Sequence, residues 1–263
     1  MRKIVQGALA LGLLAPLPAF AASPFDGTWK TDVSSAQLPK KPNVYELKNG
    51  TYICKTCTPP VTVQADGMDH PVTGHPYYDT EAVKVVDDRT IQITEKKNGK
   101  VVYTGTDTVA PDGKTMNFEF SDSSASNAAP VVGKGTAMRV AAGLAGAHAV
   151  SGSWHTVSYS TVSDNGLTQT FKVDGNTISM TTPTGQQYNA TMDGSSAPMS
   201  GDPGITSVSV KKLAANSIRE TDNRGDKVVG VTTMTVSPDG KTMKVVFENK
   251  ERGTTMSYKA MKQ

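Results

Sequence analysis

The most constraining feature of this sequence is a hexapeptide that occurs twice. Pro111-Asp112-Gly113-Lys114-Thr115-Met116 returns unchanged at residues 238–243, 127 positions later. The match extends without a gap from Asp66–Phe120 to Asp193–Phe247, with 22 identical residues in 55 positions. Self-similarity at a fixed spacing indicates an internal repeat. The chain therefore contains two copies of one structural unit.

Hydrophobic side chains in both copies alternate with polar ones. Val83 and Val85 flank a lysine in the first copy, and Met116, Phe118 and Phe120 alternate with Asn and Glu. A period of two predicts antiparallel strands with one face buried and one face in water. Turn signals such as Asn-Gly and Pro-Asp-Gly recur every eight to twelve residues and predict a meander of about eight strands per copy.

The N-terminus has the layout of a secretory signal peptide. Arg2 and Lys3 precede an apolar stretch that ends at the small-x-small site Ala19-Phe20-Ala21. We therefore expect a signal peptide at residues 1–21 and a periplasmic or secreted protein. The repeat then predicts a first domain at residues 22–140, a linker at 141–149, which is rich in small residues, and a second domain at 150–263. No later segment is apolar enough to predict a membrane span.

The only two cysteines, Cys54 and Cys57, lie in the first copy. Because an exported protein meets an oxidising compartment, a disulfide between them is the expected state. The spacing is not that of a haem attachment site, since position 58 is threonine, and no second cysteine pair completes a zinc site. Whether the bond is structural or active in thiol exchange stays open from the sequence.

A Gly-x-Trp motif opens each copy, at Gly27-Thr28-Trp29 and Gly152-Ser153-Trp154. Followed by a hairpin meander and a basic residue near the end, this motif resembles the lipocalin-like (calycin) barrels. The resemblance implies an all-β fold of two tandem antiparallel meander barrels, each plugged at one end by its Gly-Trp pair. It also implies that Arg139, and less closely Lys259, packs on a tryptophan. The tandem arrangement also resembles an uncharacterised family of exported bacterial proteins, and β-sandwich units are the structural alternative.

One loop of the first copy carries side chains that the second copy lacks. Both copies keep the Pro and Gly positions that set the course of the loop, but both histidines are replaced in the second copy. We take the polar and aromatic residues of this loop as candidate ligand-binding residues: Asp69, His70, His75, Tyr77 and Tyr78. Any specific site is accordingly predicted in the first copy or at the junction of the two.

Several classes of function find no support in the residues. Basic residues are scattered and the formal net charge is +3, or +1 after removal of Arg2 and Lys3 (3 − 2), so no nucleic-acid surface is indicated. No Gly-x-Ser-x-Gly nucleophile motif lies between a strand and a helix, and no catalytic group, metal ligand set or cofactor is predicted. The first hypothesis, which rests on the lipocalin resemblance and on export, is a protein that binds a small, mostly apolar molecule and is not predicted to be an enzyme. Two alternatives are a structural envelope protein with filled barrels and a metal or redox activity in the first copy. The sequence predicts no oligomeric state.

Overall fold

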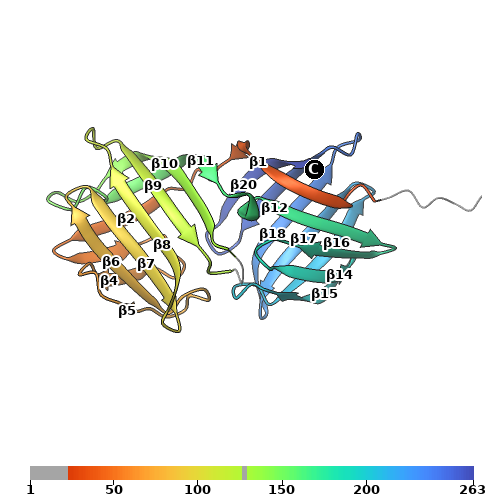
Figure 1. The fold of residues 1–263 in the computed structure, drawn as a ribbon, viewed down its shortest axis with the longest axis horizontal. Coiled ribbons are helices and arrows are strands. Elements are labelled where there is room, and N and C mark those ends of the chain that lie inside the picture. The colour runs from red at the N-terminus through yellow and green to blue at the C-terminus, as the bar shows by residue number, and fades with distance from the viewer. Residues whose placement is uncertain (1–22, 126–128) are drawn as a thin grey trace, which may run out of the picture.

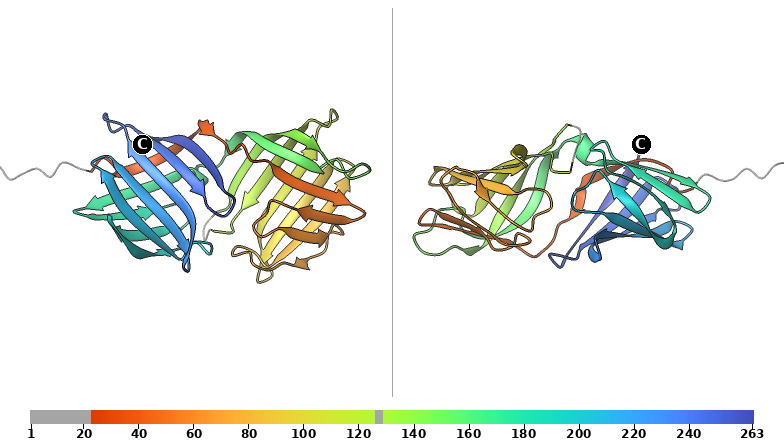
Figure 2. Two further views of the ribbon diagram at one scale, coloured as in Figure 1. Left: turned by 180° about the vertical axis from the view of Figure 1, so that it is seen from behind. Right: turned by 90° about the horizontal axis from the view of Figure 1, so that it is seen from below.

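The protein folds into two antiparallel β-barrels that lie side by side (Figures 1 and 2). The structure is a computed structural model that describes residues 23–125 and 129–263, so the predicted signal peptide at 1–21 lies outside the described residues. The all-β prediction of two meander barrels is confirmed. Each sheet has ten strands rather than about eight, and one strand of each comes from the candidate loop of the first copy, β5, or from its counterpart in the second copy, β15.

The first barrel is a ten-stranded sheet built from β2 to β11. It is not fully closed, because its two end strands, β4 and β5, do not pair with each other. An isolated bridge from Asp66 to Lys84 lies beside this seam, so the barrel is nearly closed. In chain order its strands are β2 (Asn43–Lys48), β3 (Thr51–Cys54), β4 (Val61–Gln64), β5 (His70–Pro71), β6 (Thr80–Asp87), β7 (Thr90–Lys97), β8 (Lys100–Val109), β9 (Thr115–Asp122), β10 (Val131–Ala142) and β11 (Gly152–Val162).

The second barrel is closed and combines β1 with β12 to β20. A single 3₁₀ turn, η1 (Asp164–Gly166), precedes β12. The strands of this barrel are β1 (Gly27–Gln37), β12 (Thr168–Asp174), β13 (Thr177–Thr181), β14 (Gln187–Thr191), β15 (Asp193–Ser200), β16 (Ser207–Ala214), β17 (Ser217–Arg224), β18 (Lys227–Val236), β19 (Thr242–Asn249) and β20 (Thr254–Lys262).

The two repeats exchange their opening strands. β1 pairs with β12 and β20 of the second repeat, whereas β11 pairs with β2 and β10 of the first. In Figure 1 the red β1 crosses into the blue barrel. The sequence-based boundaries 22–140 and 150–263 follow the repeat, whereas the first barrel is formed by the continuous stretch 43–162 and the second combines β1 with residues 168–262.

The hinge between β1 and β2 accounts for this path. In a barrel closed by its own first strand, residues 38–42 would have to reverse the chain into a hairpin. Pro39 and Pro42 stand in this five-residue segment. Proline fixes φ and pushes the residue before it toward an extended conformation. The segment therefore favours a chain that continues outward to the neighbouring barrel.

Each tryptophan closes one end of the barrel that its strand has joined. Trp29 and Trp154 are fully buried, and each indole nitrogen donates a 2.8 Å hydrogen bond to the carbonyl oxygen four residues earlier, Phe25 or Val150. The glycine of each motif, Gly27 or Gly152, has a φ of +115° or +132°, which disfavours any residue with a Cβ. The same plug therefore occurs twice, as expected from the Gly-x-Trp motif.

A basic side chain covers each tryptophan. Arg139 lies 4.1 Å above the ring of Trp154, and its guanidinium donates to the carbonyl oxygens of Gly113, Ala149 and Ser151 over 2.5–2.6 Å. The predicted packing of Arg139 on a tryptophan is confirmed. The suggestion of Lys259 is wrong, because Lys262 is the residue that lies over Trp29, at 5.3 Å. Lys259 is the direct cross-strand partner of Asp32, and that register places Lys262 opposite Trp29.

The disulfide Cys54–Cys57 is present, with 5.4 Å between the Cα atoms. Cys54 ends β3 and is buried in the core of the first barrel beside Leu47, Tyr52 and Val61. The predicted linker also packs on this barrel: His148 N–H donates to the carbonyl oxygen of Leu47, and Val150 is fully buried. The end of the first barrel is therefore covered by chain that joins the two repeats.

We predict that Arg139→Ala destabilises the protein by about 2–4 kcal/mol, because it removes a stacked cation and leaves three carbonyl oxygens without their donor. Chemical denaturation followed by tryptophan fluorescence measures this change. Lys262→Ala is the matched control and should cost about 1 kcal/mol or less, since Lys262 contributes stacking at a longer distance. Equal losses for the two variants would contradict this account.

Candidate functional site

The interior of the first barrel contains a row of acidic and tyrosine side chains. Glu81 of β6 is the direct cross-strand partner of Glu95 of β7, Glu95 is the partner of Tyr103 of β8, and Tyr103 is the partner of Asp122 of β9. Side chains directly opposite each other in a sheet project from the same face. Glu81 is in phase with Val83, which is fully buried in the core, so the row faces the interior.

Glu81 is the most deeply buried member of the row, with only 3% of its surface exposed. Burial raises the pKa of Glu81 to about 7. Burial and the neighbouring charge of Glu81 raise the pKa of Glu95 to about 8. Burial also raises the pKa of Asp107, which lies further along β8 than Tyr103, to about 6. No lysine or arginine charge among the described residues lowers the pKa of these three carboxyl groups.

Four tyrosines surround these carboxyl groups. Tyr45 and Tyr52 stack with ring centroids 6.2 Å apart, and the charges of Asp107 and Glu81 act on both rings. Burial is the main cause that raises the pKa of Tyr78 and Tyr103, and the charge of Glu95 adds to it. The interior is thus amphipathic, with aromatic faces and carboxyl oxygens at the same level.

The candidate loop residues separate into three groups. Asp69 pairs with Lys96 at 2.6 Å and His70 with Asp66 at 2.9 Å, both at the surface. His75 stacks on Tyr78 with ring centroids 4.5 Å apart. Tyr78 is 8% exposed and is the candidate residue that lies beside the acidic row. A direct role of these residues in ligand binding stays a prediction.

Tyr77 joins the two barrels. Its hydroxyl donates a 2.9 Å hydrogen bond to Oδ1 of Asp202 in the loop after β15. Its ring lies against Gly204, where an added Cβ would approach the hydroxyl oxygen to 2.1 Å. Tyr77 therefore acts as a structural contact across the junction, between two loops that occupy equivalent positions in the repeats.

The second barrel also contains two buried acids, Glu220 and Asp222, and Oδ1 of Asp222 has no hydrogen-bond partner among the described residues. Glu220 of β17 accepts a hydrogen bond from the Tyr188 hydroxyl, and burial followed by the charge of Asp222 raises the pKa of Glu220 to about 8. The positions equivalent to Glu81, Tyr103 and Asp107 are Val208, Gly230 and Met234. Val208 and Met234 belong to the buried core of this barrel. At these three positions the second barrel has no acid or tyrosine, but at the position equivalent to Glu95 it keeps a buried acid, Asp222.

The junction between the barrels contains an apolar crevice of about 330 Å³. It is bordered by the exchanged strands β1 and β11, the β1–β2 hinge, and one face each of β9 and β20. Phe118 and Phe120 both pack edge-on against Tyr159 on its β9–β11 wall. The side chains that border the crevice include Val33, Ala36, Leu38, Phe120, Tyr159, Val162, Leu167, Met256 and Tyr258.

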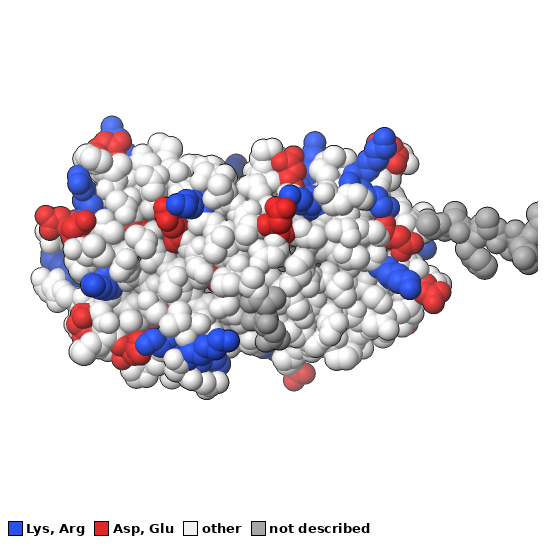
Figure 3. Space-filling model, viewed as in Figure 1, with Lys and Arg blue, Asp and Glu red and all other residues white. Residues whose placement is uncertain are grey.

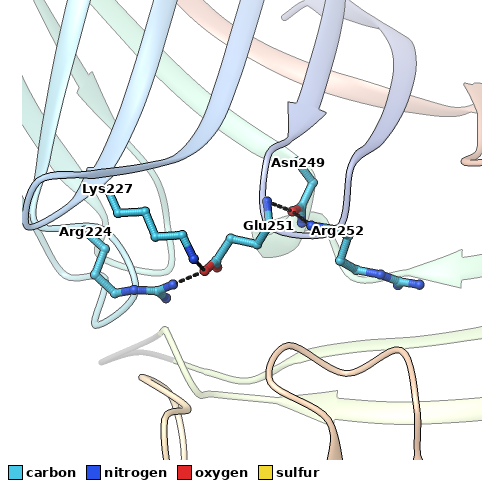
Figure 4. Close-up of polar contacts among 5 residues, drawn as sticks. All are labelled: Arg224, Lys227, Asn249, Glu251 and Arg252. Atoms are coloured by element: carbon cyan, nitrogen blue, oxygen red, sulfur yellow. Dashed lines mark hydrogen bonds and ion pairs between the residues drawn. The ribbon is translucent and has the colours of Figure 1, made fainter.

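Charged residues at the junction are mostly paired. Figure 4 shows Glu251 of the β19–β20 turn between Arg224 and Lys227, with Lys227 at 2.7 Å, while Arg252 points away from this group. The charge of Arg252 lowers the pKa of Tyr45 in the first barrel against the effect of burial. Elsewhere the face in Figure 3 shows Lys/Arg and Asp/Glu intermixed over both barrels, in keeping with the scattered charges of the sequence.

Neither a known protein family nor a curated protein sequence matches this chain. In the part of the chain that the structure describes, no helix is long and apolar enough to cross a membrane. Within residues 23–125 and 129–263, no three His, Cys, Asp or Glu side chains are grouped so that they could hold a metal ion. The barrel interior and the crevice are therefore judged on their own geometry.

Sequence reasoning missed the acidic interior. A signal was present, because Glu81 continues the phase of Val83 and Glu95 continues the phase of Ile91 and Ile93. Acidic residues in phase with core positions would have indicated buried carboxyl groups. Their approach across β6 and β7 depends on the strand register, which the sequence alone did not fix.

We predict that the thermal stability of the protein falls as the pH rises from about 5 to 9. Glu81, Glu95, Asp107 and Glu220 hold protons in the folded state that they release on unfolding, so their stabilising effect is complete at low pH and is lost as the pH passes their raised pKa values. Calorimetry across this range measures the trend.

The variant Glu95→Gln should melt at a higher temperature than wild type at pH 8.5 and at the same temperature at pH 5. Glu119→Gln, at the exposed end of an ion pair with Lys134, is the control and should leave the slope unchanged. A flat profile for wild type, or one that Glu95→Gln does not alter, would refute the assignment.

Proposed function

We propose that this protein is an exported, lipocalin-like binding protein for a small, mostly apolar molecule. The observation that carries the proposal is the crevice of about 330 Å³ at the junction of the barrels, with its predominantly apolar border. Ligand pockets are commonly apolar clefts of about 300–1,000 Å³ and occur preferentially where domains meet. Export to the periplasm or the medium follows from the predicted signal peptide.

The way in which the crevice is built supports a binding role. Its walls come from both barrels, through β1 and β20 on one side and β9 and β11 on the other. The continuous chain from β1 to β2 and from β11 to β12 connects the two walls, so the crevice is preformed rather than assembled on binding. A preformed site avoids the entropic cost of ordering its walls around the ligand.

Polar groups at the rim would orient a ligand within the crevice. Tyr159, Tyr258 and Thr31 border it among otherwise apolar side chains, and each of the three carries a hydroxyl group. Tyr159 is 36% exposed and Tyr258 packs on the core of the second barrel, so one wall is open and the other is firmly packed. A small molecule with a large apolar body and one hydrogen-bonding group fits this lining.

Native mass spectrometry of the protein purified from its own periplasm tests this function. Wild type should retain a small molecule, and Ala36→Trp should lose it because the indole would fill the crevice. Lys172→Trp adds the same ring at an exposed position of β12 and should retain the ligand. A bare wild-type mass, or retention in Ala36→Trp equal to that in Lys172→Trp, would contradict the proposal.

A further inference from the structure

An aromatic platform forms the wall of the crevice that belongs to the first barrel. It consists of Phe118 and Phe120 of β9 and Tyr159 of β11. The rings meet edge to face, with the centroid of Tyr159 5.6 Å from that of Phe118 and 6.5 Å from that of Phe120. Phe120 and Tyr159 border the crevice, and Tyr159 is 36% exposed. Part of the aromatic surface is therefore available to a ligand.

Two buried glycines of β10 allow this platform to form. Gly135 is the cross-strand partner of both Phe118 and Tyr159, and Gly133 is the partner of Phe120. An added Cβ would come within 2.3 Å of the Phe118 ring at Gly135 and within 2.5 Å of the Phe120 ring at Gly133. A glycine inside a strand often marks a close approach of another group. Here the two phenylalanine rings lie over β10 and meet Tyr159 on its far side.

The second repeat does not reproduce the platform. Val245 stands at the position of Phe118, and the cross-strand partner of Val245 is Tyr258, where that of Phe118 is a glycine. Tyr258 and Met256 instead border the crevice from the side of the second barrel. The duplicated barrel therefore folds without the ring platform. The platform is an addition of the first repeat and not a requirement of the fold.

The crevice carries no charge on its border. Among the described residues that border it, none is Lys, Arg, His, Asp or Glu, and the polar ones are Thr31, Tyr159 and Tyr258. Burial raises the pKa of both tyrosines, and the charge of Glu220 raises that of Tyr258 further, so both stay neutral at physiological pH. A charged group buried without a partner loses its hydration at a high cost. The lining therefore selects an uncharged ligand.

We propose that the ligand of the crevice is a compact, uncharged aromatic molecule. This inference names the ligand class of the binding function proposed for the crevice and rests on that function. A flat ring would pack against Phe120 and Tyr159 on one wall and against Met256 and Tyr258 on the other. Ring pairs and thioether–ring contacts are favourable beyond the burial of the same area. The volume of about 330 Å³ lies near the lower end of the range for ligand pockets, which favours a compact ligand over a long chain.

Isothermal titration calorimetry at pH 7 tests the ligand class with three probes that share one carbon skeleton. These are 2-naphthol, its saturated counterpart decahydro-2-naphthol, and the anion 2-naphthoate. Wild type should bind 2-naphthol about threefold to tenfold more tightly than the saturated alcohol, because only the aromatic probe gains ring contacts. It should bind 2-naphthoate more weakly still, since the crevice offers no positive charge.

Substitutions in the platform test which rings carry this preference. Tyr159→Leu and Phe120→Leu should each reduce the preference for 2-naphthol over the saturated alcohol by about threefold. Tyr159→Phe keeps the ring and should keep the preference. Phe247→Leu changes the equivalent of Phe120 in the second repeat, which does not border the crevice, and should bind like wild type. Melting curves show whether each variant is folded, and the partly exposed Tyr159 provides the test if Phe120→Leu is not.

The outcomes separate the ligand class from the binding function. Equal affinity for 2-naphthol and the saturated alcohol, with both lost in Ala36→Trp, would overturn the aromatic class and leave the crevice as a binding site. Equal affinity for 2-naphthoate would overturn the uncharged class. Binding of 2-naphthol that Ala36→Trp does not weaken, or no binding of 2-naphthol at all, would overturn the inference entirely. In that case the retained mass in native mass spectrometry still decides the binding function.

Discussion

The burial of each tryptophan in the barrel of the other repeat is the interaction on which the rest of this structure depends. Trp29 and Trp154 are the largest fully buried side chains, and each closes the end of a barrel whose remaining strands come from the other copy. Neither barrel is complete without the opening strand of its neighbour. The junction, its crevice and the covered end of the first barrel all follow from that exchange.

The two barrels differ in their interiors although they are copies of one duplicated unit. The second barrel is closed, and its buried Glu220 accepts a hydrogen bond from Tyr188 inside it. The first barrel has an open seam, a disulfide and acidic side chains facing its interior.

Much of the fold was predictable from local sequence signals. The repeat, the period of two, the Asn49-Gly50 turn with positive φ at both residues and the Gly-x-Trp plugs all act over short distances. The strand exchange was not predictable, because Gly27-Thr28-Trp29 and Gly152-Ser153-Trp154 are nearly equivalent and either fits either barrel. The acidic row was missed because it exists only once the register of β6 to β9 is set.

Selective disulfide formation tests the strand exchange most directly. Thr28 lies opposite Thr170 with 2.9 Å between the hydroxyl oxygens, whereas in an unexchanged barrel it would lie opposite Val44, the partner of the equivalent Ser153. The account predicts that Thr28→Cys/Thr170→Cys forms a disulfide within a monomer and that Thr28→Cys/Val44→Cys does not, as peptide mapping under non-reducing conditions would show. A disulfide between positions 28 and 44, or a 28–170 bond found only in a dimer, would contradict it.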